Sequence, residues 1–452
     1  MKKLLLAMSL VLPAAAAAQE AALDLPAVYR QALASDPQWA AAQSSNQAAQ
    51  EKLVQGRALT LPSASLSANA NHSQSDIRYD ARSGGFGGGG GISSGGYEKF
   101  ESYGYSVNVS HPLYRKQNRI QYEQSKTQVV QAAEQLDAAQ QDLILRVTQA
   151  YFDVLLAQYR IDLIAAQKSA IARQLEQAQA NFEVGTATIT DVHEAQARHD
   201  LTLAQEVGAL NDLDAKKRVL QAITGQYYER LAGAGDKLQV ALPEPHEMEK
   251  WVEIAERSNR ALKIQQQTLE LADQEIERTR AGHLPTLDVV GSYSDTRSNG
   301  SINGFGSDLK NFTLGLQFEL PLYQGGAITS REREAVANRQ RALDELENAR
   351  RQAALQARQA YLSVSSSAAQ VKAYEQALAS TQSQLDSTTL GYEVGVRTSV
   401  DVLNAQQQLY SARYDLQQAR YAYLVSSIRL KAATGMLQPA DLDDTSRKLA
   451  GS

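Results

Sequence analysis

The chain of 452 residues contains one structural unit twice, and this repeat restricts its possible folds more than any other feature. Paired motifs recur at a constant spacing of 210 residues: Gln149-Ala-Tyr151 with Gln359-Ala-Tyr361, Glu183-Val-Gly185 with Glu393-Val-Gly395, Asp191-Val192 with Asp401-Val402, Ala195-Gln196 with Ala405-Gln406, and Thr224-Gly225 with Thr434-Gly435. A constant spacing of this kind indicates a duplicated architecture. We therefore divide the chain into a first repeat at 19–225, a linker at 226–246, a second repeat at 247–435 and a C-terminal tail at 436–452.

Each repeat is predicted to contain a very long helical hairpin. Neither Gly nor Pro interrupts the 72 residues from Leu113 to Val184 or the 64 residues from Ala327 to Leu390, and good helix formers dominate both runs. At 1.5 Å per residue the first run reaches roughly 100 Å, far longer than a helix of a globular domain. Both runs end at Val-Gly, where glycine can adopt the left-handed conformation that caps a helix. A second helical run follows each turn, so the hairpin tips are predicted at 184–186 and 394–396.

Four segments alternate between apolar and polar residues with a period of two, as β-strands do. We predict strands at 62–76, 100–113, 285–295 and 311–321, with a single helix before the first strand of each repeat. Each segment is about as long as the nine to eleven residues that a tilted membrane strand needs. An ordinary half-buried sheet gives the same alternation, but the long helices and an export signal favour outer-membrane strands. Since four strands are too few to close a membrane barrel, the chain must form an oligomer, whose size the strand count leaves open.

Composition and motifs exclude several classes of protein. Residues 1–18 have the charged start, apolar stretch and small-residue cleavage site of a secretory signal. The chain has no Cys, which excludes thiolate metal sites, and a net charge of −5, which argues against nucleic acid as a partner. The stretch from Gly84 to Gly96 lacks the Lys-Ser/Thr of a phosphate loop and is interpreted as an extracellular loop. We expect no enzymatic activity, no cofactor and no metal site.

The chain resembles the TolC family of outer-membrane efflux proteins over nearly its whole length after the signal. The blocks that carry the resemblance are Gly282-His-Leu-Pro-Thr-Leu-Asp288, Leu320-Pro-Leu-Tyr-Gln-Gly-Gly326, Phe182-Glu-Val-Gly185 with Ile189-Thr-Asp-Val192, and Gly391-Tyr-Glu-Val-Gly395 with Val400-Asp-Val-Leu403. The resemblance implies a mainly α protein with membrane β-strands: a homotrimer with a 12-stranded outer-membrane β-barrel, continued by a 12-helix periplasmic α-barrel. It also implies a passive exit duct of the Gram-negative outer membrane for efflux or type I secretion. A periplasmic adaptor would open this duct, and an inner-membrane transporter would supply the energy.

The resemblance places an acidic ring at the periplasmic entrance. Asp401 matches this ring, in which three symmetry-related carboxylates attract cations and raise one another's pKa. Asp191 and Asp401 also fit a purely structural alternative, in which an acidic residue is favourable near a helix N-terminus. The family has a second acidic residue one helical turn later, where this chain has Asn404. This difference implies weaker cation selectivity and weaker block by polyvalent cations.

The resemblance also implies polar links that hold the entrance closed. The matching residues are Tyr392 and Arg397 on one side, and Thr190 and Asp191 on the other. Arg397 can donate several hydrogen bonds to a carboxylate, while the alternative is an arginine exposed only to water. The positions expected to contact an adaptor are the two hairpin tips, Val184, Gly185, Thr186, Val394, Gly395 and Val396.

Two other classes of protein compete with the duct. A periplasmic adaptor or other coiled-coil scaffold also has helical hairpins and an export signal, but normally one hairpin rather than two. A porin formed by one chain is excluded by the small number of strands and the long helices. The cargo is left open, since drugs, metals and secreted proteins all fit such a duct.

Overall fold

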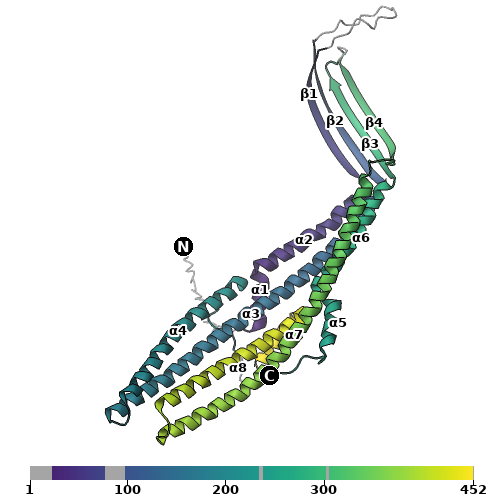
Figure 1. Cartoon of the computed structure of the whole chain (residues 1–452). Helices are drawn as coiled ribbons and strands as arrows, with labels where there is room; N and C mark the ends of the chain where they lie inside the picture. Colours follow the sequence, from purple (N-terminus) through teal and green to yellow (C-terminus); the bar gives the residue numbers. More distant parts are fainter. Residues whose placement is uncertain (1–22, 77–96, 234–237, 302–304, 451–452) are drawn as a thin grey trace, which may run out of the picture. The chain divides into compact units, whose positions relative to one another are not determined.

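The computed structural model describes residues 23–76, 97–233, 238–301 and 305–450 (Figure 1). The predicted signal at 1–18 and the glycine-rich stretch at 84–96 lie outside the described residues. The elements in chain order are α1 (Leu25–Ser35), α2 (Pro37–Ala58), β1 (Ser63–Asp76), β2 (Tyr97–Tyr114), α3 (Lys116–Glu183), α4 (Ile189–Thr224), α5 (Met248–Ser258), α6 (Arg260–Arg280), a 3-10 turn (Ala281–His283), β3 (Thr286–Ser298), β4 (Ser307–Glu319), α7 (Ala327–Glu393), α8 (Ser399–Ala433) and α9 (Ala440–Ala450).

The order helix, helix, strand, strand, long helix, helix occurs twice among these elements. The helices of the two hairpins correspond in length, since α3 has 68 residues and α7 has 67, while α4 has 36 and α8 has 35. This agreement follows from the constant spacing of the repeated motifs. Among the described residues, no helix is both long enough and apolar enough to cross a membrane.

The single helix predicted before the first strand of each repeat is wrong, because the structure has two helices there. In the first repeat the break is at Asp36, whose ψ of 118° is extended. Pro37 follows, and proline disfavours the helical conformation of the residue before it. In the second repeat the break is at Asn259, with ψ of 128°, and its Nδ2 donates to the Ala433 carbonyl at 2.9 Å. No proline marks this second break, so the sequence gives no local signal for it.

The strands differ from their predicted ranges mainly at their ends. β2 begins at Tyr97 rather than at position 100, and β3 extends to Ser298 rather than 295. The last strand was predicted at 311–321 but spans Ser307–Glu319. It stops there because Pro321, two residues further on, has no backbone N–H to donate to a ladder.

Contacts divide the chain into two compact units, and the first is the sheet unit, Gln43–Leu136 with Arg260–Arg351. Its antiparallel sheet has the order β1-β2-β3-β4. Successive rows across the sheet alternate in character. One row pairs Leu66, Val107, Tyr293 and Phe312, and the next pairs Ser67, Ser106, Ser294 and Asn311. Because successive residues of a strand point to opposite faces, the sheet has one apolar and one polar face.

The second unit, the hairpin unit, comprises Met1–Ala42, Asp137–Asn259 and Gln352–Ser452. Its core surrounds the middle of α3, where Tyr151 and Phe152 are buried and their rings meet edge to face. Phe152 also packs against Tyr421 of α8, with ring centroids 5.2 Å apart. Large buried side chains concentrate here, whereas alanine predominates in the buried positions of α7. The burial of α7 thus rests mainly on small side chains, without a thick core of large ones.

Three tyrosine hydroxyls of the hairpin unit anchor the linker between the repeats. Tyr151 donates to the Ala232 carbonyl at 2.8 Å, and Tyr423 donates to the Ala241 carbonyl at 2.8 Å. Tyr361, the repeat equivalent of Tyr151, donates to the carbonyl of His246. Burial raises the pKa of Tyr151, so its hydroxyl keeps the proton that this bond needs. The linker is thus attached to both hairpins.

Candidate functional sites in the sheet and at the hairpin tips

The apolar face of the sheet is exposed in the single chain. Phe312, Leu314, Leu316 and Phe318 of β4 share this face, and between 65% and 71% of each residue is exposed. Tyr323 lies just beyond β4 and is 88% exposed. A continuous exposed apolar surface of this kind marks a membrane or protein interaction. An aromatic residue beyond the end of a strand is typical of the border of a membrane-facing band.

The polar face carries an ion pair with a buried carboxylate, where β2 ends beside the start of β3. Arg115, just after β2, donates through Nη2 to the Asp288 carboxylate at 2.5 Å and through Nε at 2.9 Å. The Asp288 side chain is only 5% exposed. Bonds to both oxygens are the strong geometry for an arginine and a carboxylate. This pair fixes the end of β2 against the start of β3.

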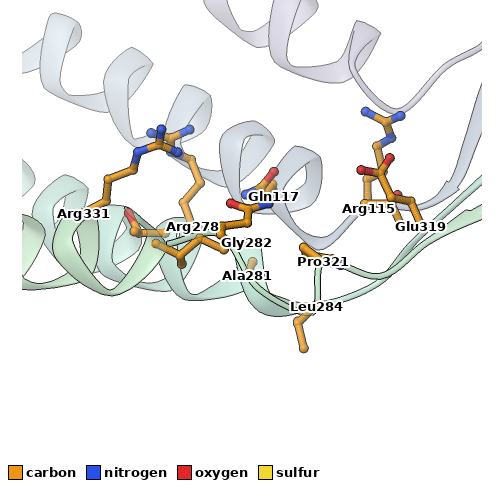
Figure 2. A pocket seen from close by; sticks show the side chains of 13 residues that line it. Arg115, Gln117, Arg278, Ala281, Gly282, Leu284, Glu319, Pro321 and Arg331 are labelled. Carbon is orange, nitrogen blue, oxygen red and sulfur yellow. The ribbon is translucent and has the colours of Figure 1, made fainter. Parts of the chain in front are cut away.

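A pocket of about 330 Å³ lies beside this ion pair within the sheet unit. Figure 2 shows Arg115 beside Glu319 at one end of the pocket, and Arg278 and Arg331 at the other. Glu319 lines the pocket together with the three arginines, so the lining combines positive and negative charge. Arg278 is also paired with Glu275 at 2.5 Å. The sequence analysis did not find this pocket, because its residues come from distant segments of both repeats.

The two hairpin tips have the same backbone hydrogen bonds. The N–H of Gly185 donates to Phe182 and the N–H of Thr186 to Asn181, while the N–H of Gly395 donates to Tyr392 and the N–H of Val396 to Gly391. Gly185 and Gly395 have φ of 79° and 80°, the left-handed conformation that the sequence predicts. All six predicted adaptor-contacting residues are exposed. The two tips therefore have the same backbone conformation, and both are exposed on the surface of the single chain.

Asp191 and Asp401 occupy equivalent structural positions just after the tips. Each is the third residue of a helix and forms a capping box with the threonine before that helix. The Asp401 carboxylate accepts from the Thr398 N–H at 2.9 Å and from the Thr398 hydroxyl at 3.0 Å. These bonds from Thr398, aided by the nearby charge of Arg397, lower the pKa of Asp401. The structural alternative considered for both aspartates is thus realised.

The predicted gate residues lie close to the tips but contact other groups in the single chain. Tyr392 accepts a hydrogen bond from Asn181 of the first hairpin at 3.4 Å. The side chain of Arg397 lies over Gly391, where an added Cβ would be 2.7 Å from the Arg397 Cγ. Within the parts of the chain that the structure describes, no hydrogen bond joins Arg397 or Tyr392 to Thr190 or Asp191.

Arg198 is a residue of this region that the sequence analysis missed. It lies on α4, and its guanidinium donates to Asn404 at 3.0 Å and to Gln407 at 2.6 Å, both on α8. Glu194, four residues before it on the same helix, gives the only sequence signal, and that signal indicates an ordinary surface ion pair. Its contact with the second hairpin was not predictable, because Arg198 is separated in sequence from Asn404 by 206 positions and from Gln407 by 209. Residues so far apart meet only when the helices pack.

No candidate metal centre is present in the described part of the chain, since no cluster of three or more His, Cys, Asp or Glu is found there. The polar groups of the tip region instead serve as helix caps and as links between helices.

Comparisons with known proteins agree with this geometry. A family model described as "Outer membrane efflux protein" matches residues 28–226 and 251–436. The chain is 35% identical over 428 residues to the Outer membrane protein TolC of Vibrio cholerae, covering 94% of both chains. It is 33% identical over 424 residues to the Alkaline protease secretion protein AprF of Pseudomonas aeruginosa, covering 93% of this chain and 86% of AprF. The solved structure of the Campylobacter jejuni CmeC outer membrane channel matches 94% of this chain and 89% of its own, with a TM-score of 0.75 and 17% identity.

These matches confirm the predicted family, location and channel function, and they give no support to the adaptor or scaffold alternative. The family consists of channel proteins rather than known enzymes. The TM-score of 0.75 with CmeC shows a shared fold, since the sequence identity is only 17%. The 35% identity with TolC shows the family, and the repeat, the exposed apolar sheet face and the tip motifs agree with it. The chain therefore belongs to the outer membrane efflux protein family and is a TolC-type exit channel of the Gram-negative outer membrane.

Proposed function

We propose that three copies of this chain form a closed duct, with a 12-stranded barrel in the outer membrane and a 12-helix tube in the periplasm. The observation that carries this proposal is the sheet: four strands with an exposed apolar face, and β1 and β4 at its two edges. Open strand edges are not tolerated in lipid, so the edges must pair with neighbouring copies. The number three rests on membership of the TolC-type family.

The helical part of each protomer supports the same assembly. Two hairpins per chain contribute α3, α4, α7 and α8, and three chains supply the twelve helices. Exposed apolar side chains on α4, such as Leu201 and Val207, would be covered by neighbours or by a partner. The linker and the C-terminal tail would form a belt around the tube, held by the tyrosine contacts described above.

We further propose that the duct is passive and gated at the hairpin tips. Asp401 and Asn404 would line the periplasmic entrance, and Tyr392 and Arg397 would be linked to Thr190 and Asp191 in the closed trimer. Opening is then a two-state change that a partner biases by binding one state better. The partner is a periplasmic adaptor that contacts both tips, and an inner-membrane transporter supplies the energy. Type I secretion is included as a role because one relative is named an alkaline protease secretion protein.

The experiment that tests the duct is planar-bilayer conductance of the detergent-purified protein, wild type against Asp401→Ala. Small, cation-preferring currents that lose their preference in the variant are the expected result. Failure of the wild type to insert and conduct would contradict the duct. Insertion with no effect of the substitution would retain the duct but remove Asp401 from its entrance. The mass of the assembly in detergent, measured on the same sample, decides between three copies and another number.

A further inference from the structure

Arg198 connects the two hairpins of one protomer close to their tips. Its Nη1 donates to Gln407 Oε1 at 2.6 Å, its Nη2 donates to Asn404 Oδ1 at 3.0 Å, and its Nε donates to Glu194 Oε1 at 3.3 Å. Two of these three acceptors belong to α8 of the second hairpin. Asn404 and Gln407 are three residues apart and thus share one face of that helix, which suits the planar fork of a guanidinium.

The charge distribution around Arg198 makes this connection easy to reverse. Both acceptors on α8 are neutral amides, while the carboxylate that balances Arg198 is on its own helix. If the hairpins separate, Arg198 keeps Glu194 as its partner, and no unpaired charge remains on α8. A carboxylate at position 404 would behave differently, because separation of the hairpins would leave this carboxylate on α8 without its positive partner. The contact therefore joins the two hairpins through hydrogen bonds but does not oppose their separation as an ion pair would.

The position of the contact ties it to any movement of the hairpins. It borders a small core in which Ile171 of α3, Ala195 of α4 and Leu403 of α8 are all buried. A cavity of only about 20 Å³ lies beside it, lined in part by Arg198, Leu403 and Gln407. A space of that size holds at most about one water molecule, so the hairpins are closely packed here. A further bond joins the hairpins nearby, since Gln174 of α3 donates to Ser399 of α8 at 3.2 Å. Outward movement of the second hairpin must break the Arg198 bonds together with this core.

We propose that Arg198 is a latch between the two hairpins of each protomer, acting through Asn404 and Gln407 to favour the closed duct. This inference rests on the gated duct proposed above, and it assigns to Asn404 a role other than a weakened acidic ring. Arg198 is a positioning residue in this scheme, because it sets the balance between closed and open states without contacting the cargo.

The test measures open probability of the purified protein in planar bilayers. Arg198→Ala is expected to raise the ratio of open to closed states about tenfold, as the loss of hydrogen bonds to a charged group would do. The open-to-closed ratio of Arg198→Lys should lie between those of Arg198→Ala and the wild type, because an ammonium group lacks the planar fork that reaches both amides. Arg173→Ala is the matched control, because Arg173 is an exposed arginine on the neighbouring helix α3. Equal effects of Arg198→Ala and Arg173→Ala would overturn the proposal.

A second variant keeps the test independent of folding. Asn404→Asp introduces a carboxylate across the hairpins and should lower open probability about tenfold, while Asn404→Ala with Gln407→Ala should raise it as Arg198→Ala does. Combining these alanine substitutions with Arg198→Ala should add little, because all three remove the same contact. If the wild type does not conduct, the duct itself fails; if it conducts but Asn404→Asp leaves open probability unchanged, the latch fails.

Discussion

Gly435 lies directly against the backbone of Ser258, so that a Cβ built on Gly435 would be 2.1 Å from the Ser258 carbonyl oxygen. Gly435 directly follows Thr434, the C-cap of α8, and Ser258 precedes the break between α5 and α6. The first repeat has the same arrangement, with Gly225 after α4 and Ser35 before the break between α1 and α2, but the contact is looser at 3.3 Å. The helix breaks thus make room for the glycine that ends each hairpin.

We expect Gly435→Ala to be far more damaging than Gly225→Ala. Both glycines have positive φ, 74° and 72°, so each alanine is strained by about 1–2 kcal/mol. Only at Gly435 must the added methyl also displace a backbone carbonyl, which cannot rotate away as a side chain can. The amount of assembled protein in outer-membrane fractions and its melting temperature in detergent measure the difference. Equal losses in the two variants would contradict the contact.

Asp36→Asn is expected to destabilise the hairpin unit by about 1–3 kcal/mol at neutral pH. The Asp36 side chain is 1% exposed and is paired with Arg146 at 2.6 Å. The loss is moderate because Arg146 also pairs with Asp142 at 2.7 Å and is not left alone.

The Asp36 contribution should depend on pH in a defined direction. Burial raises the pKa of Asp36, but hydrogen bonds from Arg146 and from the N–H groups of Trp39 and Gln38 outweigh it, so the pKa lies below its ordinary value of 3.8. A lowered folded-state pKa means that the contribution is present above the unfolded-state value and is lost as pH falls through the folded-state value. The gap between wild-type and Asp36→Asn melting temperatures should therefore narrow only in acid below about pH 4. A gap that is constant from pH 7 to pH 3 would argue against an ionised Asp36.

Asp401→Asn tests two roles of this side chain separately: it should keep the cap of α8 but remove the negative charge. The asparagine side chain keeps an oxygen that can accept from the Thr398 N–H, so the melting temperature should change little. The cation preference should fall, because the negative charge is gone. Asp191→Asn is the matched comparison for loss of the same cap, because Asp191 accepts from the Thr188 N–H at 3.0 Å in the same geometry. A similar loss of selectivity in both variants would show that Asp401 has no special place in the pore.

Gly391→Ala is expected to act on the gate through Arg397. The added methyl would meet the Arg397 Cγ at 2.7 Å and move that side chain. Open probability should then rise, as it should in Arg397→Ala and Asp191→Ala if these residues link the closed entrance. Gly208→Ala is the control, because nothing lies within 4 Å of a Cβ at that position of α4. Unchanged channel records for Arg397→Ala and Asp191→Ala would remove them from the gate.

Leu314→Lys should prevent stable insertion of the sheet into the outer membrane. Leu314 is on the apolar face, and a lysine facing lipid near the middle of the membrane costs about 2–4 kcal/mol per copy. Thr313→Lys, one residue away on the polar face, should be tolerated. Outer-membrane fractionation of both variants measures this. Equal insertion would contradict the assignment of the apolar face to lipid, and failure of Thr313→Lys alone would reverse it.

The long hairpins, the left-handed glycines at their tips and the two faces of the sheet follow from the sequence alone. They depend on local properties: the absence of Gly and Pro over 72 and 64 residues, a Val-Gly at the end of each run, and a period of two in the strands. The duplication made these predictions stronger, because each feature is seen twice.

Tertiary structure decided the features that depend on which distant residues meet. The break at Asn259 has no proline to mark it, and the side chain there bonds to Ala433, 174 positions away. Arg198 reads in the sequence as half of a surface ion pair with Glu194, yet packing of α4 against α8 directs its guanidinium to Asn404 and Gln407. Local periodicity determines where a helix or strand forms. The partner of a polar side chain is fixed only when two elements pack together, because removing that side chain from water makes an unpaired polar group costly.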